Sequence, residues 1–409
     1  MTEKLRGRLV VGQSGGCTAV INSSLVGVVE EALQHPEIES VYGLVDGVHG
    51  LLEERFVDLT YESPGTLSRV RRTPSAALGS CRHKLRNDEL QRALDVLRAH
   101  DVRYFCYIGG NDSADSSHRL AEAARRTDYD LRVVSVPKTI DNDLPITDHC
   151  PGYGSIARFV ALATRDAGHD TESMHRVDPV KIVEVMGRNA GWVAAASALG
   201  KSDDRDAPHL VWIPERPFDA DAFLTTVDAT LRRIGYCVVV ISETIRYADR
   251  TPVASVGHAD AFGHPRLVGA SNALCGLVEE KLGVKARWDR PGTIQRMSIV
   301  AASEVDLEEA YLAGRAAVRA GIGGQSDKMV TLVRQSDEPY RCATGLVDLA
   351  SIANQERLLP DGYLNAEGTA VSREFVEYAR PLLGAPLPNY GRLARFPVEQ
   401  QLGAVKSGA

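Results

Sequence analysis

The chain has few cysteines and no hydrophobic run long enough to cross a membrane. Its 7 cysteines are scattered, odd in number and free of any Cys-x-x-Cys pair, a pattern that argues against a disulfide framework and against a zinc site. No apolar stretch approaches the roughly 20 residues of a transmembrane helix, and the first residues contain no signal-peptide core. We therefore expect a cytoplasmic protein without membrane attachment.

An excess of positive charge is missing as well. Lysine and arginine number 47 against 54 acidic residues, a formal net charge of -7, which argues against a general nucleic-acid-binding protein. The 11 histidines lie in no HExxH motif and no triad-like context, so hydrolases of those kinds are unsupported. With 409 residues the chain exceeds the size at which a single core stops growing, and two domains are expected.

Apolar strand-like runs alternate with helical patterns along most of the chain. We expect strands at 9–11, 104–108, 133–136, 181–185, 210–213, 237–241 and 329–333, and helices at 18–33, 114–125, 155–167, 191–199 and 307–320. This alternation is typical of an α/β fold with parallel sheets and helices on both faces. We expect surface loops at 202–206 and 247–266. The stretch 381–409 is expected to be an irregular wrap, or a short helix with a loose tail.

One turn concentrates more chemistry than any other part of the chain. The residues from Pro137 to Pro145 (PKTIDNDLP) follow a short apolar run that is typical of a buried strand. Lys138, Asp141 and Asp143 would therefore stand together at the carboxyl end of a strand, where open α/β sheets bind their ligands. An ordinary Asp-rich turn is the alternative, but this density of charge is unusual for a mere turn. The motif favours a base, a metal anchor and a phosphate-pairing cation.

Two glycine turns each follow a predicted strand and open a predicted helix. They are Gly12-x-x-Gly15-Gly16 and Gly109-Gly110-Asn111-Asp112-Ser113. In this setting backbone N–H groups and the helix dipole can receive a phosphate. The first is neither a Walker A loop nor a Rossmann fingerprint, and its glycines could serve only a tight turn. The second could be an ordinary helix N-cap. Their pairing in one chain favours a polyphosphate site.

Further charged candidates stand at other turns and strand ends. They are Arg82, Arg188, Glu243, Arg287, Arg290 and Arg296. Arginines suit phosphomonoesters because the planar guanidinium can bind two oxygens at once. The alternative is that they are solvated surface arginines. Glu243, at the end of the strand expected at 237–241, could accept hydrogen bonds from sugar hydroxyls.

Together these segments resemble the phosphofructokinase family from about residue 7 to residue 335. The resemblance rests on motifs in the family's order: SGG (14–16), LGSxR (78–82), GGNDS (109–113), PKTIDND (137–143), VEVMGR (183–188), SE (242–243) and PGxIQR (291–296). It implies two Rossmann-like three-layer domains with the active site in the cleft between them. Residues 1–150 with about 297–350 would bind the phosphoryl donor. Residues 151–296 with about 351–409 would bind the sugar phosphate and form the C-terminal wrap.

Two positions make the chain similar to the pyrophosphate-dependent branch of this family. The ATP-dependent members have glycine at the position of Asp112, which leaves room for the α-phosphate of the nucleotide, and tend to have glycine at the position of Lys138. An aspartate fills that space and repels the anion, whereas an ammonium pairs with a terminal pyrophosphate oxygen. The resemblance therefore implies pyrophosphate and fructose 6-phosphate as substrates, Mg²⁺ as cofactor, and a homodimer or homotetramer.

The resemblance also implies roles for individual residues. Asp141 would be the base for the C1 hydroxyl of the sugar, and an ordinary aspartate with a pKa of about 3.9 is a carboxylate at neutral pH. Lys138 and Thr139 would complete the catalytic group. The donor would be held by Gly15, Gly16, Arg82, Asp112 and Lys138. The sugar phosphate would be held by Thr139, Asp141, Met186, Gly187, Arg188, Glu243, Arg287 and Arg296. Mg²⁺ would be held among Asn111, Asp112 and Asp143.

Three departures from the family's pattern leave alternatives open. Asn111 stands in the place of the usual metal-binding aspartate, Pro179 in that of an arginine given by a neighbouring subunit, and Thr293 in that of a histidine near the sugar phosphate. Another acceptor such as sedoheptulose 7-phosphate, an ATP-dependent phosphofructokinase, and a non-catalytic sugar-phosphate-binding regulatory paralogue are the alternatives.

Overall fold

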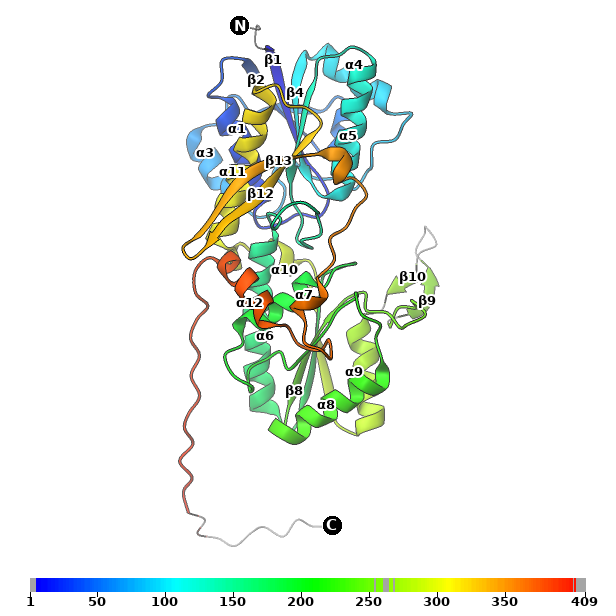
Figure 1. Cartoon of the computed structure of the whole chain (residues 1–409), viewed down its shortest axis with the longest axis vertical. Helices are drawn as coiled ribbons and strands as arrows, with labels where there is room; N and C mark the ends of the chain where they lie inside the picture. Colours follow the sequence, from blue (N-terminus) through cyan, green and yellow to red (C-terminus); the bar gives the residue numbers. More distant parts are fainter. Residues whose placement is uncertain (1–4, 254, 260–264, 268, 400, 402–409) are drawn as a thin grey trace.

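The computed structural model describes residues 5–253, 255–259, 265–267, 269–399 and 401. They form two α/β bodies, one above the other in Figure 1, each built on a sheet of its own. The first body contains a 7-stranded sheet and the second a 4-stranded sheet. The expected α/β class with two bodies is thereby confirmed. No helix in the described ranges is both long and apolar enough to span a membrane.

The first sheet has the strand order β13-β12-β5-β4-β1-β2-β3. Its strands are β1 (Gly7–Gln13), β2 (Ile38–Leu44), β3 (Phe56–Asp58), β4 (Val102–Gly109), β5 (Arg132–Pro137), β12 (Lys328–Asp337) and β13 (Tyr340–Asp348). The inner strands pair in parallel, but β3 and β13 pair antiparallel at the two edges. The expected parallel pairing is therefore found among the inner strands, and the two edge strands depart from it. Their connections are shorter than the dozen or so residues that a parallel crossover needs.

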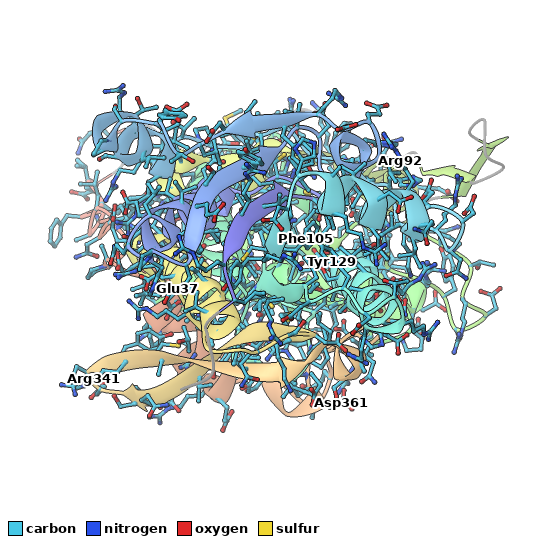
Figure 2. The ribbon with its side chains drawn as sticks, turned by 90° about the horizontal axis from the view of Figure 1, so that it is seen from above. Glu37, Arg92, Phe105, Tyr129, Arg341 and Asp361 are labelled. Carbon is cyan, nitrogen blue, oxygen red and sulfur yellow. The ribbon has the colours of Figure 1, made fainter. Side chains whose placement is uncertain are left out.

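Helices cover both faces of the first sheet because its strands are apolar on both sides. One layer contains α1 (Ile21–Ala32), α3 (Pro64–Arg71) and α11 (Glu304–Ile322), and the other α2 (Val48–Leu52), α4 (Leu90–Ala99) and α5 (Asn111–Arg126) (Figure 1). Along β1, Leu9 and Val11 pack into the first layer and Val10 into the second, as the two-residue period of a strand requires. Seen from above, Phe105 and Tyr129 lie inside this body (Figure 2), and both are buried.

The second sheet is parallel throughout, with the order β11-β6-β8-β7. Its strands are β6 (Val180–Val185), β7 (Leu210–Trp212), β8 (Cys237–Ser242) and β11 (Ala286–Asp289). One face packs on α6 (Tyr153–Met174), α7 (Trp192–Ala196), η1 (Ser197–Gly200) and α12 (Arg373–Ala379), and the other on α8 (Ala220–Ile234) and α9 (Ala270–Leu282). Val183 and Val238 face the first layer, whereas Ile182 and Val239 face the second.

The chain passes between the two bodies more than once (Figure 1). After β11 it returns through α10 (Ile294–Met297), η2 (Ile299–Ala301) and α11 to the first sheet, where β12 and β13 form a hairpin. Arg341 lies on this hairpin at the outer edge of the molecule (Figure 2). The chain then runs through η3 (Leu349–Ser351) and η4 (Asp361–Tyr363) to α12 and η5 (Arg380–Leu383) on the second body.

The expected strands are all present, and the expected helices are found with longer or shorter bounds. The segment 191–199 is only in part an α-helix, because α7 continues as the 3₁₀ turn η1. The expectation of a loop at 247–266 is wrong for its described end, where β9 (Ser255–Ala259) pairs antiparallel with β10 (Pro265–Leu267). Residues 254 and 260–264 of that prediction lie outside the described residues. Beyond η5, the described residues up to 399 contain no helix or strand, as expected for 381–409.

Candidate active site

A cleft of about 450 Å³ lies where the carboxyl ends of strands from both sheets face each other. The first body contributes the residues after β1, β4 and β5, and the second those after β6 and β8. The predicted site residues that line the cleft are Gly15, Gly16, Arg82, Asn111, Asp112, Lys138, Thr139, Asp141, Asp143, Met186, Arg188, Glu243 and Arg296. Residues far apart in sequence thus share one cavity because parallel strands end at the same edge of a sheet.

Two of the predicted sugar-binding residues are not part of this lining. Gly187 lies between Met186 and Arg188 at a φ of 139°, so it shapes the turn that presents its neighbours. Arg287 lies on the edge strand β11, where its guanidinium binds Asp178 at 2.5 Å and its side chain is 56% exposed. Within this chain, Arg287 is therefore on the surface and outside the cleft.

Lys138 is a buried cation at the end of β5. Its side chain is 3% exposed, and its Nζ donates a hydrogen bond to the Gly16 carbonyl at 2.8 Å. Gly15 has a φ of 74°, and a Cβ on it would lie 3.2 Å from the same Nζ, so this glycine lets the ammonium approach the backbone. Burial, and then the Arg296 guanidinium, lower the pKa of Lys138 to about 8. The ammonium still predominates at neutral pH.

Asp141 does not have the ordinary carboxyl that the sequence implied. Burial first, and then the carboxylates of Asp143 and Glu243, raise its pKa to about 7 against the opposing charges of Arg188 and Lys138. A base whose pKa is near the working pH is matched to proton transfer. The turn itself is organised locally, because the Asp141 backbone N–H donates to the Thr139 hydroxyl at 3.1 Å.

The part of the cleft that the sequence predicts to bind the donor lies at the start of α5. A Cβ on Gly109 would lie 2.0 Å from the Ser113 hydroxyl, so glycine is needed for this tight turn. The α5 N-terminus then presents Asn111 and Asp112 to the cleft. The Asp112 carboxylate is 87% exposed, and one of its oxygens lies 3.9 Å from the Lys84 ammonium. A carboxylate in this position disfavours a further anion on the same side.

The part of the cleft that the sequence predicts to bind the sugar phosphate is formed by the second body and by α10. The Met186 backbone N–H donates to Gln295 at 3.0 Å, and the Thr244 hydroxyl donates to the Arg188 carbonyl, so both turns are fixed. Burial raises the pKa of Glu243, and Glu184 raises it further. Arg296 reaches towards the donor turn, since a Cβ on Gly16 would lie 2.8 Å from its guanidinium.

The cleft also contains oxygen ligands that suit a divalent cation. Asn111 Oδ1 and Asp143 Oδ1 are buried and have no hydrogen-bond partner in the described structure. Oxygen ligands of this kind are those that Mg²⁺ prefers, and Mg²⁺ usually keeps waters and shares substrate phosphates. Among the described residues, no group of three or more His, Cys, Asp and Glu could hold a metal by itself. The residues therefore fit a cation that is held jointly with a phosphate.

Some lining residues received no individual role in the sequence analysis. Ser14, Cys81, Gly110, Ser113 and Ile140 lie within its quoted motifs, whereas His83, Tyr107, Asn189, Ala190 and Glu356 lie outside them. Most of them adjoin a recognised motif, so proximity in sequence was a usable signal. Glu356 has no such signal, because it comes from a segment without any motif, far from the others along the chain.

Two parallel-sheet bodies that place basic and acidic strand ends around one cleft are typical of α/β enzymes that bind phosphorylated ligands. The chain belongs to the phosphofructokinase family, whose model matches residues 8–320. The resemblance of the sequence to this family is thereby confirmed.

Relatives in this family are similar over nearly the whole chain. Pyrophosphate–fructose 6-phosphate 1-phosphotransferase of Halomonas elongata is 40% identical, over 96% of this chain and 98% of its own. The protein of the same name from Rhodospirillum rubrum is 42% identical, over 95% and 97%. The crystal structure of a pyrophosphate-dependent phosphofructokinase from Nitrosospira multiformis matches with a TM-score of 0.85 and 37% identity, over 98% of this chain and 100% of that one.

Proposed function

We propose that this protein transfers a phosphoryl group reversibly from pyrophosphate to the C1 hydroxyl of fructose 6-phosphate, giving fructose 1,6-bisphosphate and phosphate. The observation that carries the donor assignment is the pair Lys138 and Asp112: a buried ammonium and a carboxylate at the donor end of one cleft. The names of the relatives support the same reaction.

The donor would lie between the two glycine turns of the first body. Gly16 would offer its backbone N–H, whereas the Gly15 N–H already donates to the Cys81 carbonyl at 2.9 Å, so Gly15 would shape the turn. Arg82 and Lys138 would neutralise the phosphate charge. A bound divalent cation, which we propose to be Mg²⁺ with Asn111, Asp112 and Asp143 as its candidate ligands, would withdraw charge from the phosphoryl oxygens. Phosphoryl transfer depends on such positioning and charge neutralisation more than on covalent chemistry.

The acceptor would lie against the second body. Asp141 takes the proton of the C1 hydroxyl, and Thr139 supports its turn. Met186, Gly187, Arg188 and Glu243 hold the sugar, and Arg296 holds the 6-phosphate. The arrangement supports a donor-binding body of residues 1–150 with about 297–350, and a sugar-binding body of residues 151–296 with about 351–409.

Arg287 has a place in this scheme only if the enzyme is an oligomer. Its guanidinium lies outside the cleft of its own chain, so it would serve the sugar phosphate of a neighbouring subunit. We therefore include a homodimer or homotetramer in the proposal, with a cytoplasmic location and with no nucleic-acid or membrane partner.

A donor and acceptor screen on the purified protein tests the proposal. Formation of the bisphosphate, coupled to aldolase, would be measured with pyrophosphate or ATP and with fructose 6-phosphate or sedoheptulose 7-phosphate, each with Mg²⁺. We expect turnover with pyrophosphate and fructose 6-phosphate. Turnover with ATP and none with pyrophosphate would refute the donor, and preference for the seven-carbon sugar would refute the acceptor.

A further inference from the structure

The cleft is crossed by a segment that lies outside the part of the chain matched by the family model. Residues 354–359, which we call the strap, join η3 on the first body to η4 on the second. On the first body, the Asn354 side chain accepts a hydrogen bond from Lys84 Nζ at 3.0 Å. On the second, both oxygens of Glu356 accept from the Asn189 side chain, at 2.8 and 3.0 Å. The strap is thus tied to both walls of the site.

Arg357 of the strap contacts the catalytic turn from behind. Its backbone N–H donates to the Asp143 carbonyl at 2.7 Å. Its guanidinium donates twice to the Asn142 carbonyl, at 3.1 and 3.2 Å, and once each to the Thr147 and Asp148 carbonyls, both at 2.7 Å. All of these acceptors are backbone carbonyls. Arg357 therefore fixes the path of the chain around the two carboxylates and leaves their own oxygens free for the cleft.

The guanidinium is itself held in place. It lies 4.6 Å over the ring of Trp192, a contact that attracts a cation to the aromatic face. The Trp192 indole N–H donates to the Arg357 carbonyl at 3.1 Å. Trp192 is buried in the main core of the second body. The catalytic turn of the first body is thereby attached to the core of the second body through one arginine.

The residue between the two carboxylates is held from several sides. Asn142 has a φ of 53°, a left-handed conformation that asparagine adopts more readily than most residues other than glycine. Its buried side chain accepts from the Cys150 N–H at 3.0 Å and donates to the Tyr378 hydroxyl at 3.1 Å. The side chain and the carbonyl of Asn142 are thus both held by other segments, and the carbonyl is held by Arg357.

We propose that Arg357 is a positioning residue for phosphoryl transfer, which holds the backbone between Asp141 and Asp143 so that the base meets the acceptor hydroxyl. This inference rests on the proposed function. A displacement of about 1 Å at a reacting group can lower a rate by about 10²-fold. Loss of the Arg357 guanidinium, which we call the clamp, would release the carbonyl of Asn142, the one residue that separates the two carboxylates. Arg357 itself does not line the cleft, so substrate binding depends on it little.

The test compares Arg357→Met and Arg357→Lys with a matched control. Arg165→Met removes an arginine of the same kind, which donates to the Pro388 carbonyl at 2.6 Å and lies 4.2 Å over the ring of Tyr390, away from the cleft. We expect kcat with pyrophosphate and fructose 6-phosphate to fall about 10- to 100-fold in Arg357→Met, with both KM values within about threefold. The kcat of Arg357→Lys should lie between those of Arg357→Met and the native enzyme, and Arg165→Met should keep the native kcat.

A second measurement separates positioning from loss of structure. Guanidinium ion added at millimolar concentration to Arg357→Ala should raise kcat, because the ion can occupy the vacated clamp, and it should leave the native enzyme and Arg165→Met unchanged. A native protein without turnover refutes the proposed function and not the clamp. With an active native enzyme, three results refute the clamp: an unchanged kcat in Arg357→Met, an equal fall in Arg165→Met, or no guanidinium rescue. If Arg357→Met fails to fold, the kcat of Arg357→Lys and the guanidinium rescue of Arg357→Ala test the proposal in its place.

Discussion

The raised pKa of Asp141, the proposed base, predicts an effect on stability as well as on rate. Asp141 has a pKa of about 7 in the folded protein against a usual 3.8, so the folded state binds its proton more tightly than the unfolded state does. The stability that this proton contributes is present at low pH and is lost as the pH rises through about 7. Above that pH, Asp141 is charged in the folded protein, and this buried charge lowers the free energy of unfolding.

Asp141→Asn should therefore stabilise the ligand-free protein while it disables the enzyme. The rise from 3.8 to about 7 corresponds to about 4 kcal/mol at pH 8. The Asp141 side chain is only partly enclosed, and solvent in the cleft should reduce this to about 2 kcal/mol. In a chain of this length that is a rise of about 2 °C in the midpoint of thermal unfolding. Turnover should fall by about 10²–10⁴-fold or more, with binding of the sugar phosphate still measurable.

The assay is thermal unfolding of both proteins at pH 5 and at pH 8, without substrate or divalent cation. The stabilisation by Asp141→Asn should grow between these two pH values, because up to about pH 7 the folded carboxyl keeps a proton that the unfolded chain has already lost. An equal midpoint difference at both pH values would contradict the raised pKa. An undiminished kcat would remove Asp141 from the mechanism.

Three further predictions concern the donor, the sugar and the pH range. The value of kcat/KM should rise with pH up to about 7 as Asp141 loses its proton, and should fall above about 8 as Lys138 loses its own; a flat profile from pH 5.5 to 7 would contradict the base. Asp112→Gly combined with Lys138→Gly should abolish most use of pyrophosphate and allow some use of ATP, in the coupled assay. An unchanged donor preference would show that these two residues do not set it. Arg296→Met should raise the KM for fructose 6-phosphate about tenfold or more; an unchanged KM would place the 6-phosphate elsewhere.

Local patterns predicted the parts of the fold that local physics determines. The buried strands β1, β4, β5, β6 and β8 are short apolar runs with a turn motif at their carboxyl ends, and this arrangement is recognisable because each run must be covered on both faces. The inner strand β2 and the edge strands β3, β11 and β13 were missed because they are partly exposed and have no such run. Whether an exposed segment becomes a strand depends on a partner strand that local sequence does not specify.

The candidate site also has features that local sequence predicts and features that depend on the whole fold. Lys138, Asp141 and Asp143 could be predicted because a single turn contains all three. Their pKa values could not, because those of Lys138 and Asp141 depend on burial and on Arg188, Glu243 and Arg296, which later parts of the chain bring into the cleft. Arg287 was a candidate because of its charge and its neighbouring arginines, and within this chain the fold places it on an edge strand, paired with Asp178.

The electrostatics of the cleft explain why a cation belongs in it. Asp141, Asp143 and Glu243 all have raised pKa values, with burial as the first cause, so the surroundings of these three carboxyls disfavour further negative charge. A pyrophosphate anion would disfavour it further and would raise the pKa of the base again. Arg82 and Lys138 offset part of this negative charge. Lys138 also lies near Arg296, whose positive charge lowers the pKa of Lys138. A divalent cation beside the unpartnered oxygens of Asn111 and Asp143 would therefore return the base to its carboxylate form at the moment when the donor is bound.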